Sequence, residues 1–261
     1  MTSALQRREL YLLLAVVTAA GGWLLMPVIH QPQAYHGFAD QRSFLDVPRA
    51  ADVLSNLPFV AVGLLGIWRL ARTNQPLSWV THRSLAVFFA GFFLTGFGSG
   101  YYHWDPNDAR LVLDRLPMTI AFAGLLGALV AERISQRSGL AMLFLMLAVG
   151  PVSVFYWKST GDLSLYVLAQ FGAMLATLIL LCATAPGPFP LPWWQLLLWY
   201  AAAKVAESAD PFVWRATSEI FAGHAIKHLA AAMGALAIAN ALRPSRAAVV
   251  SNAANRIPGN V

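Results

Sequence analysis

Three histidines carry the clearest chemistry in this sequence. His224 and His228 stand four residues apart in Gly-His-Ala-Ile-Lys-His, a spacing that places both imidazoles on one face of a helix. On its own this pair is weak evidence for a metal site, because two histidines often fall four residues apart. His103, which closes an earlier apolar stretch, supplies a third imidazole. Three histidines with a water as fourth ligand are typical of a catalytic zinc site. The sequence therefore predicts that His103, His224 and His228 bind zinc.

A hydroxyl and a carboxylate accompany these histidines. Ser99 lies one helical turn before His103, and Asp114 begins the apolar run after the next turn. A carboxylate beside a zinc site can take a proton from water, and a hydroxyl can donate to a substrate oxyanion. We expect these catalytic roles for Asp114 and Ser99. The alternatives are that Arg110 or Arg115 neutralises Asp114 and that Ser99 bonds back to its own helix.

Other polar residues in the apolar runs are expected to have structural roles. Ser55 and Asn56 are neighbours inside one run, where interhelical hydrogen bonding is the expected role. Trp193 and Trp194 are expected at a membrane interface. Ion pairs are expected among four residues near the histidine end of the protein, namely Lys204, Glu207, Asp210 and Lys227.

Composition identifies the surroundings of these groups. Apolar residues make up 58% of the chain and charged residues 11%, against about 25% charged in soluble domains. This predicts an integral membrane protein, in which a buried polar group is costly and usually functional. The net charge is +6, but the basic residues stand singly at helix ends, which argues against nucleic-acid binding. The single cysteine, Cys182, excludes a disulfide framework.

The apolar runs predict an all-α polytopic bundle with eight spans. An N-terminal anchor helix and an external loop are expected in residues 1–50, a seven-helix core in 51–243, and a disordered cytoplasmic tail in 244–261. The first run is too long for the core of a signal peptide, so we expect it to be retained. The expected spans are 10–29, 51–70, 83–102, 111–131, 139–156, 163–184, 193–208 and 220–242.

Basic residues predict the orientation of this bundle. Eight spans put both termini on one side, and that side carries most of the arginines. Both termini are therefore expected to be cytoplasmic, which places His103, Asp114, His224 and His228 at the external end. The terminal side holds Arg7, Arg8, Arg69, Arg72, Arg83, Arg133, Arg137, Arg243, Arg246 and Arg256, and the other side holds Arg42, Arg49, Arg110, Lys158 and Arg215.

The set of motifs resembles the alkaline ceramidase family and, more broadly, the membrane hydrolase superfamily that includes the adiponectin/progestin receptors. The resemblance implies a seven-helix core, a zinc ion on the three histidines, and catalytic Ser99 and Asp114. It also implies hydrolysis of the amide in ceramide-like lipids to a fatty acid and a sphingoid base. The matching pieces, in family order, are Ser55-Asn56, Ser99-x-x-x-His103, Asp114 and His224-x-x-x-His228.

Two features differ from the family pattern. The seven-helix pattern has no counterpart of the run at 10–29. Eukaryotic alkaline ceramidases also carry an acidic calcium site, which includes a glutamate seven residues ahead of the Asn in the Ser-Asn pair. That position is Arg49 here, and Asp40, Asp46 and Asp52 nearby do not reproduce the pattern. The resemblance therefore extends to zinc but not to calcium, and it leaves the lipid substrate open.

Together these patterns predict a zinc-dependent amidohydrolase that cleaves the N-acyl amide of a membrane lipid. An intramembrane serine protease is one alternative, with Ser99 as nucleophile and a histidine as base. However, Phe-Gly-Ser-Gly does not match Gly-x-Ser-Gly, and two histidines would have no role. The other alternative is a non-enzymatic receptor or transporter with a structural zinc. The sequence does not indicate an oligomeric state.

Overall fold

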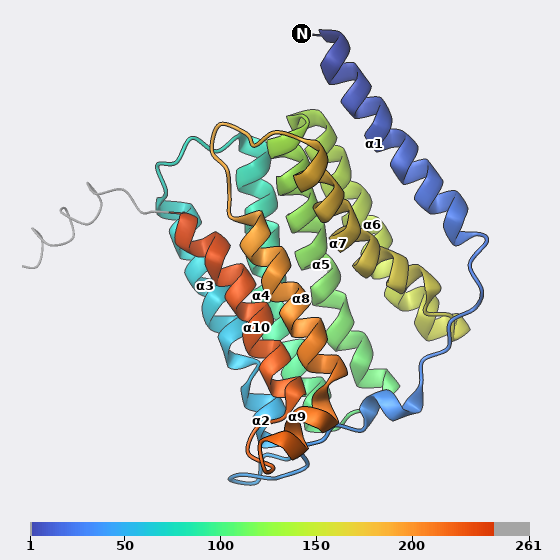
Figure 1. Ribbon diagram of the computed structural model, residues 1–261, viewed down its shortest axis with the longest axis vertical. Coiled ribbons are helices and arrows are strands. Elements are labelled where there is room, and N and C mark those ends of the chain that lie inside the picture. The colour runs from blue at the N-terminus through green and yellow to red at the C-terminus, as the bar shows by residue number, and fades with distance from the viewer. Residues whose placement is uncertain (1, 243–261) are drawn as a thin grey trace, which may run out of the picture.

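The computed structural model describes residues 2–242, which form an all-helical bundle without a strand (Figure 1). Five segments are long and apolar enough to cross a membrane: Ala50–Arg72, Trp79–Trp104, Asp108–Arg133, Gln136–Thr160 and Ser164–Ala183. The predicted helical, membrane-type architecture is confirmed in this respect, whereas the count of eight spans is not. The elements are α1 (Thr2–Trp23), η1 (Gln33–His36), α2 (Ala50–Leu54), α3 (Leu57–Arg72), α4 (Trp79–Trp104), α5 (Asp108–Arg133), α6 (Gln136–Thr160), α7 (Ser164–Ala183), α8 (Trp193–Ser208), α9 (Asp210–Ala216) and α10 (Gly223–Ala241).

Two expected spans depart most clearly from the helices that form. Helix α1 ends at Trp23, short of the expected 29, and Pro27 lies in the extended chain that follows. The expected span 51–70 is divided into α2 and α3. The Ser55 hydroxyl and the Asn56 amide both donate to the Asp52 carbonyl, at 3.0 and 2.7 Å, and so compete with the helical ladder at this point.

Glycines bring α4 against its neighbours. A Cβ on Gly91 would lie 2.4 Å from the Ala121 nitrogen of α5, and one on Gly96 would lie 2.4 Å from Cγ2 of Val60 on α3. Only glycine allows such an approach, so these helices pack backbone to backbone. This packing fixes the last turn of α4, which carries His103, beside the start of α5.

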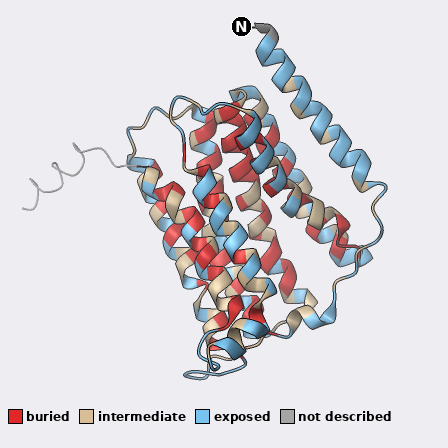
Figure 2. Cartoon of the chain, in the orientation of Figure 1, coloured by how far each residue is buried: buried red, intermediate tan, exposed pale blue. Residues whose placement is uncertain are grey.

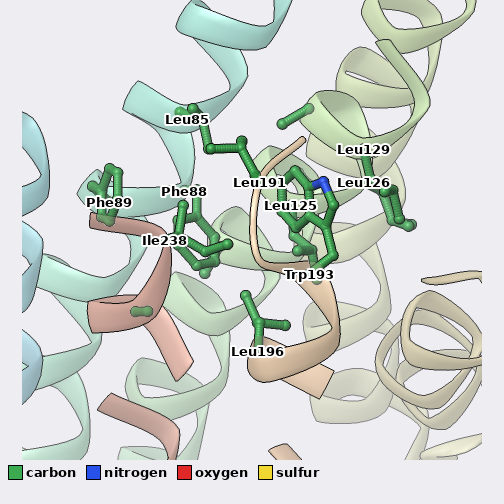
Figure 3. Close-up of a cluster of buried hydrophobic side chains, with 14 of the residues drawn as sticks. Leu85, Phe88, Phe89, Leu125, Leu126, Leu129, Leu191, Trp193, Leu196 and Ile238 are labelled. Atoms are coloured by element: carbon green, nitrogen blue, oxygen red, sulfur yellow. The ribbon is translucent and has the colours of Figure 1, made fainter. Parts of the chain in front are cut away.

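The main apolar cluster joins buried side chains of α3, α4, α5, α6, α7, α8 and α10 (Figure 3). Trp193 belongs to this cluster and is only 1% exposed, so its expected place at a membrane interface was wrong. Its indole donates to Oε2 of Glu132 at 2.8 Å, which supplies the polar partner that an interface would otherwise give. Trp194 is exposed. The labelled members of the cluster are Leu85, Phe88, Phe89, Leu125, Leu126, Leu129, Leu191, Trp193, Leu196 and Ile238.

Helix α1 stands at the edge of the bundle and is mostly exposed (Figure 2). Near its two ends it is held by polar contacts, from Ser135 Oγ to Glu9 at 2.6 Å and from Trp23 Nε1 to Ser164 Oγ at 3.0 Å. Between these contacts an apolar cavity of about 490 Å³ separates α1 from α6 and α7. The division into an anchor at 1–50 and a core at 51–243 stays a prediction, and the tail at 244–261 lies outside the described residues.

Candidate metal centre

The three histidines meet at one end of the bundle. His103 lies in the last turn of α4, and His224 and His228 lie in the first turns of α10. All three are buried, and their candidate ligand atoms lie within 4.8 Å of one another. Among the described residues, no other group of three or more His, Cys, Asp or Glu is close enough to share a metal ion.

The geometry of these imidazoles fits a zinc ion. Nε2 of His103 and Nε2 of His224 are 3.3 Å apart. Two nitrogens on a tetrahedral zinc, each about 2.0–2.1 Å from the metal, stand roughly 3.3 Å apart. Nε2 of His228 is buried and has no hydrogen-bond partner within the described chain. A buried unpartnered nitrogen is destabilising, and coordination to a metal would remove that cost.

Ser55 orients the third imidazole. Its hydroxyl lies 2.8 Å from Nδ1 of His228 and joins α10 to the segment between α2 and α3. The expected interhelical hydrogen bond is thus present for Ser55. Asn56 instead donates to the Asp52 carbonyl within its own segment. A contact to the second ring nitrogen fixes the orientation of a histidine ligand, and it leaves Nε2 facing the other two rings.

The loop between α1 and α2 closes over the centre. The Phe38 ring lies 4.7 Å from the His103 ring and 4.4 Å from the His224 ring, centroid to centroid. Arg49 donates from Nε to the His103 carbonyl at 2.9 Å and from Nη2 to the Trp104 carbonyl at 2.6 Å. These bonds satisfy carbonyls that the end of α4 leaves without helical partners. The loop therefore covers the histidines and holds the turn that carries His103.

Ser99 and Asp114 lie together beside the histidines. Both are buried. With His228 they line a cavity of about 220 Å³. Arg110, one residue expected as a neutralising partner, pairs with Asp105 at 3.4 Å. Asp114 and Arg115 form no ion pair in the part of the chain that is described.

A second, apolar cavity of about 100 Å³ adjoins the first. Phe59, Thr95 and Met118 line both cavities, and Phe88 and Phe92 extend the second toward the apolar cluster. Together the two cavities run from the polar end of the bundle into its interior. Such a shape accepts a ligand with a polar head and an apolar tail.

Glu207 joins two lysines at the wall of the larger cavity. Its carboxylate accepts from Lys227 Nζ at 2.8 Å and also from Lys204, so these expected ion pairs are confirmed. Lys227 Nζ also lies 3.2 Å from Nε2 of His224. Burial raises the pKa of the Tyr35 phenol, which stays protonated and contacts Glu207 at 3.4 Å.

Asp210 does not join this ion-pair group, contrary to expectation. Its two carboxylate oxygens accept the backbone N–H groups of His224, at 2.8 Å, and of Ala39, at 2.9 Å. The first bond serves an N–H at the start of α10, which has no helical partner. Asp210 therefore fixes the start of α10, the helix that carries two of the three imidazoles.

Sequence patterns did not identify two parts of the site, the loop between α1 and α2 and the side chain of Arg115. Phe38, Tyr35 and Arg49 lie in or beside a polar loop without periodicity, so no pattern indicated that they return to the histidines. Its sequence position indicated Arg115 only as a partner of Asp114, whereas in the structure Arg115 lines the cavity itself. Its position next to Asp114 on a helix was the one available signal.

A comparison with known families matches residues 49–188 to the family described as Ceramidase, which is more than half of the 261-residue chain. No curated protein matches the chain. The matched segment contains Ser55, Ser99, His103 and Asp114, but it ends before the histidine pair of α10. The proximity of that pair to His103 is therefore an observation independent of the family match.

Proposed function

The chain belongs to the ceramidase family, and from this premise we propose that it hydrolyses the N-acyl amide of a ceramide-like membrane lipid as a zinc-dependent enzyme. Water and the amide are consumed, and a fatty acid and a sphingoid base are released. Family membership implies an amide hydrolase, and the zinc and the substrate are the proposal. The observation that carries it is the convergence of three buried imidazoles beside a cavity lined by Ser99 and Asp114.

His103, His224 and His228 would hold the metal. When bound, zinc supplies a Lewis acid for the amide carbonyl and lowers the pKa of water to about 7. Ser55 holds Nδ1 of His228 and so keeps Nε2 turned to the other imidazoles. Phe38 covers two of the rings and limits the access of bulk water from the loop side.

Asp114 would move the proton, and Ser99 would donate a hydrogen bond. As water attacks the carbonyl carbon, the Asp114 carboxylate takes one of its protons. The same carboxyl group then returns that proton to the amide nitrogen as the carbon–nitrogen bond breaks, so that the base leaves as a neutral amine. Ser99 donates its hydroxyl proton in a hydrogen bond, to Asp114 or to the developing oxyanion. Among the described residues none of the three histidines is hydrogen-bonded to Ser99, which supports this role over that of a nucleophile, because a nucleophilic serine needs a base such as histidine.

The two adjoining cavities support a lipid substrate. The apolar one, lined by Phe88 and Phe92, would take part of the acyl chain, and the polar one would take the amide and the head group. This assignment places the scissile amide between Asp114 and His228. A fatty acid released there would leave along the same apolar path.

Orientation in the membrane remains part of the proposal. The distribution of arginines favours cytoplasmic termini and an external metal centre. A cysteine at Gln33, with Cys182 replaced by alanine, should react with an impermeant thiol reagent in intact cells, and one at Ser251 should not. The reverse labelling pattern would put the centre on the cytoplasmic side.

Hydrolysis itself is tested with purified protein and mass spectrometry of the products. We expect release of a sphingoid base and a fatty acid from ceramide or a related N-acyl amide. Turnover should stop after chelation and return with added zinc. A protein that binds zinc but hydrolyses no N-acyl amide lipid would instead be a receptor or transporter with a structural metal.

A further inference from the structure

Arg115 has no role in the hydrolysis described above, yet it is among the most buried charged residues of the cavity. It is only 5% exposed. Its guanidinium carbon lies 4.3 Å from the centre of the Trp157 ring and 4.8 Å from that of Tyr166. Nη2 donates to the Gln31 side chain, whereas Nη1 is buried and has no hydrogen-bond partner among the described residues.

Its neighbours in the structure do not neutralise Arg115. No carboxylate in the described chain lies within ion-pair distance of the guanidinium. Successive residues of a helix point about 100° apart, so Asp114 and Arg115 diverge from their shared backbone. A buried cation that has polar and aromatic neighbours but no anion is still unfavourable in an apolar environment. A ligand that brings a negative charge to Nη1 would remove this cost.

The charges of the cavity favour the same conclusion. Lys204 and Lys227 share the Glu207 carboxylate, and the proposed hydrolysis uses the Asp114 carboxylate. This leaves the cavity with one positive charge in excess, and the guanidinium is the cation without a carboxylate. The charged residues that line the cavity are Asp114, Arg115, Lys204, Glu207 and Lys227.

We propose that Arg115 forms an anion subsite for the head group of the substrate. The preferred substrates are then N-acyl amide lipids with a carboxylate or a phosphate on the amine half, rather than neutral ceramide. The subsite is at the polar end of the cavity, beside Gln31 and Tyr35 of the loop and away from the apolar cavity assigned to the acyl chain. Arginine suits such a group because its planar guanidinium donates two parallel hydrogen bonds to an oxyanion. This inference rests on the proposed hydrolysis for its substrate, but not for the binding itself.

The experiment compares lipids that differ only in the charged group. One pair is an N-acylglycine and the N-acylethanolamine of equal chain length, and the other is ceramide 1-phosphate and ceramide. Binding is measured in the Asp114→Asn background, so that turnover does not interfere, and hydrolysis is measured in the wild-type chain. The first pair tests a carboxylate and the second a phosphate, so the two sources of the anion are separated.

We expect the acidic member of at least one pair to bind about 10–100-fold more tightly, which is the usual effect of a charge-assisted hydrogen bond. Adding Arg115→Met should remove this preference and leave the neutral member within about threefold. Arg115→Lys should keep only part of it. Arg110→Met on the same helix, which removes an arginine outside the cavity, is the matched control and should keep it.

Equal binding of acidic and neutral lipids in both pairs would overturn the subsite, even if ceramide is hydrolysed. Arg115-dependent binding of an acidic lipid that is never hydrolysed would support the subsite and contradict the proposed hydrolase. If Arg115→Met does not fold, the ratio of the affinities for the acidic and the neutral lipid in the Asp114→Asn protein that keeps Arg115 decides the question.

Discussion

Helix α5 carries an acid followed by an arginine near each of its ends, and the two pairs have opposite surroundings. At the end of the helix, Glu132 accepts from Arg133 at 3.1 Å and from the Trp193 indole at 2.8 Å, and Arg133 donates to the Thr184 carbonyl at 2.9 Å. Near its start, Asp114 and Arg115 form no ion pair, and Arg115 keeps a buried nitrogen without a hydrogen-bond partner in the described part of the chain. The same residue types are fully bonded at one end and incompletely bonded at the other.

The difference separates stability from function. A buried ionic group whose hydrogen bonds are all made holds the fold together, and it offers nothing to a ligand. Two buried nitrogens have no hydrogen-bond partner in the described chain, Nε2 of His228 and Nη1 of Arg115, and they destabilise the unliganded protein. A bound metal ion or ligand would remove that cost. We therefore expect substitutions at the Asp114 end to change chemistry, and substitutions at the Glu132 end to change stability.

The largest expected effect is on turnover. Asp114→Asn keeps the size of the side chain but cannot accept a proton from water. We expect the turnover number to fall by about 10²–10⁴-fold, the usual contribution of a general base. Zinc content and thermal stability should stay close to those of the wild type, because Asp114 is not among the three ligands. A fully active Asp114→Asn protein would show that the Asp114 end of α5 has no catalytic role.

A substitution at the Glu132 end of α5 should lower stability and leave turnover unchanged. Glu132→Ala leaves the buried Arg133 without its carboxylate, and removing one partner of such a pair costs about 3–5 kcal/mol of stability. Thermal unfolding in detergent should show a clear loss, whereas turnover per folded molecule should be retained. Glu219→Ala, at an exposed acid, is the control. Unchanged unfolding in Glu132→Ala would mean that the bonded pair contributes no stability.

A smaller effect is expected at Ser55, which contacts a proposed zinc ligand and not the metal itself. Ser55→Ala removes the hydrogen bond to Nδ1 of His228, and losses of this kind typically weaken metal binding by about 10–100-fold. Competition with a zinc chelator measures the change. Ser153→Ala is the matched control, since that buried hydroxyl bonds only the Gly150 carbonyl of its own helix. Equal zinc affinities of the two variants would assign Ser55 to packing alone.

Sequence patterns predicted the helices and the main candidate residues for physical reasons. Apolar runs in a membrane-type chain must form helices, and the four-residue spacing of His224 and His228 puts both on one face. The loop over the centre was beyond such reasoning, because Phe38 and Arg49 reach it through irregular backbone. Arg49, for example, adopts a left-handed conformation, with φ of 45°. The burial of Trp193 depends on a partner far away in the chain, the Glu132 carboxylate.

The central claim is that the three imidazoles form one metal site, and the zinc content of the purified chain tests it directly. We expect about one zinc per wild-type chain by elemental analysis, and little or none in the His103/His224/His228→Ala triple variant. Asp114→Asn should match the wild type. Full zinc occupancy in the triple variant, or a wild-type chain that binds no zinc when supplied with it, would contradict the assignment.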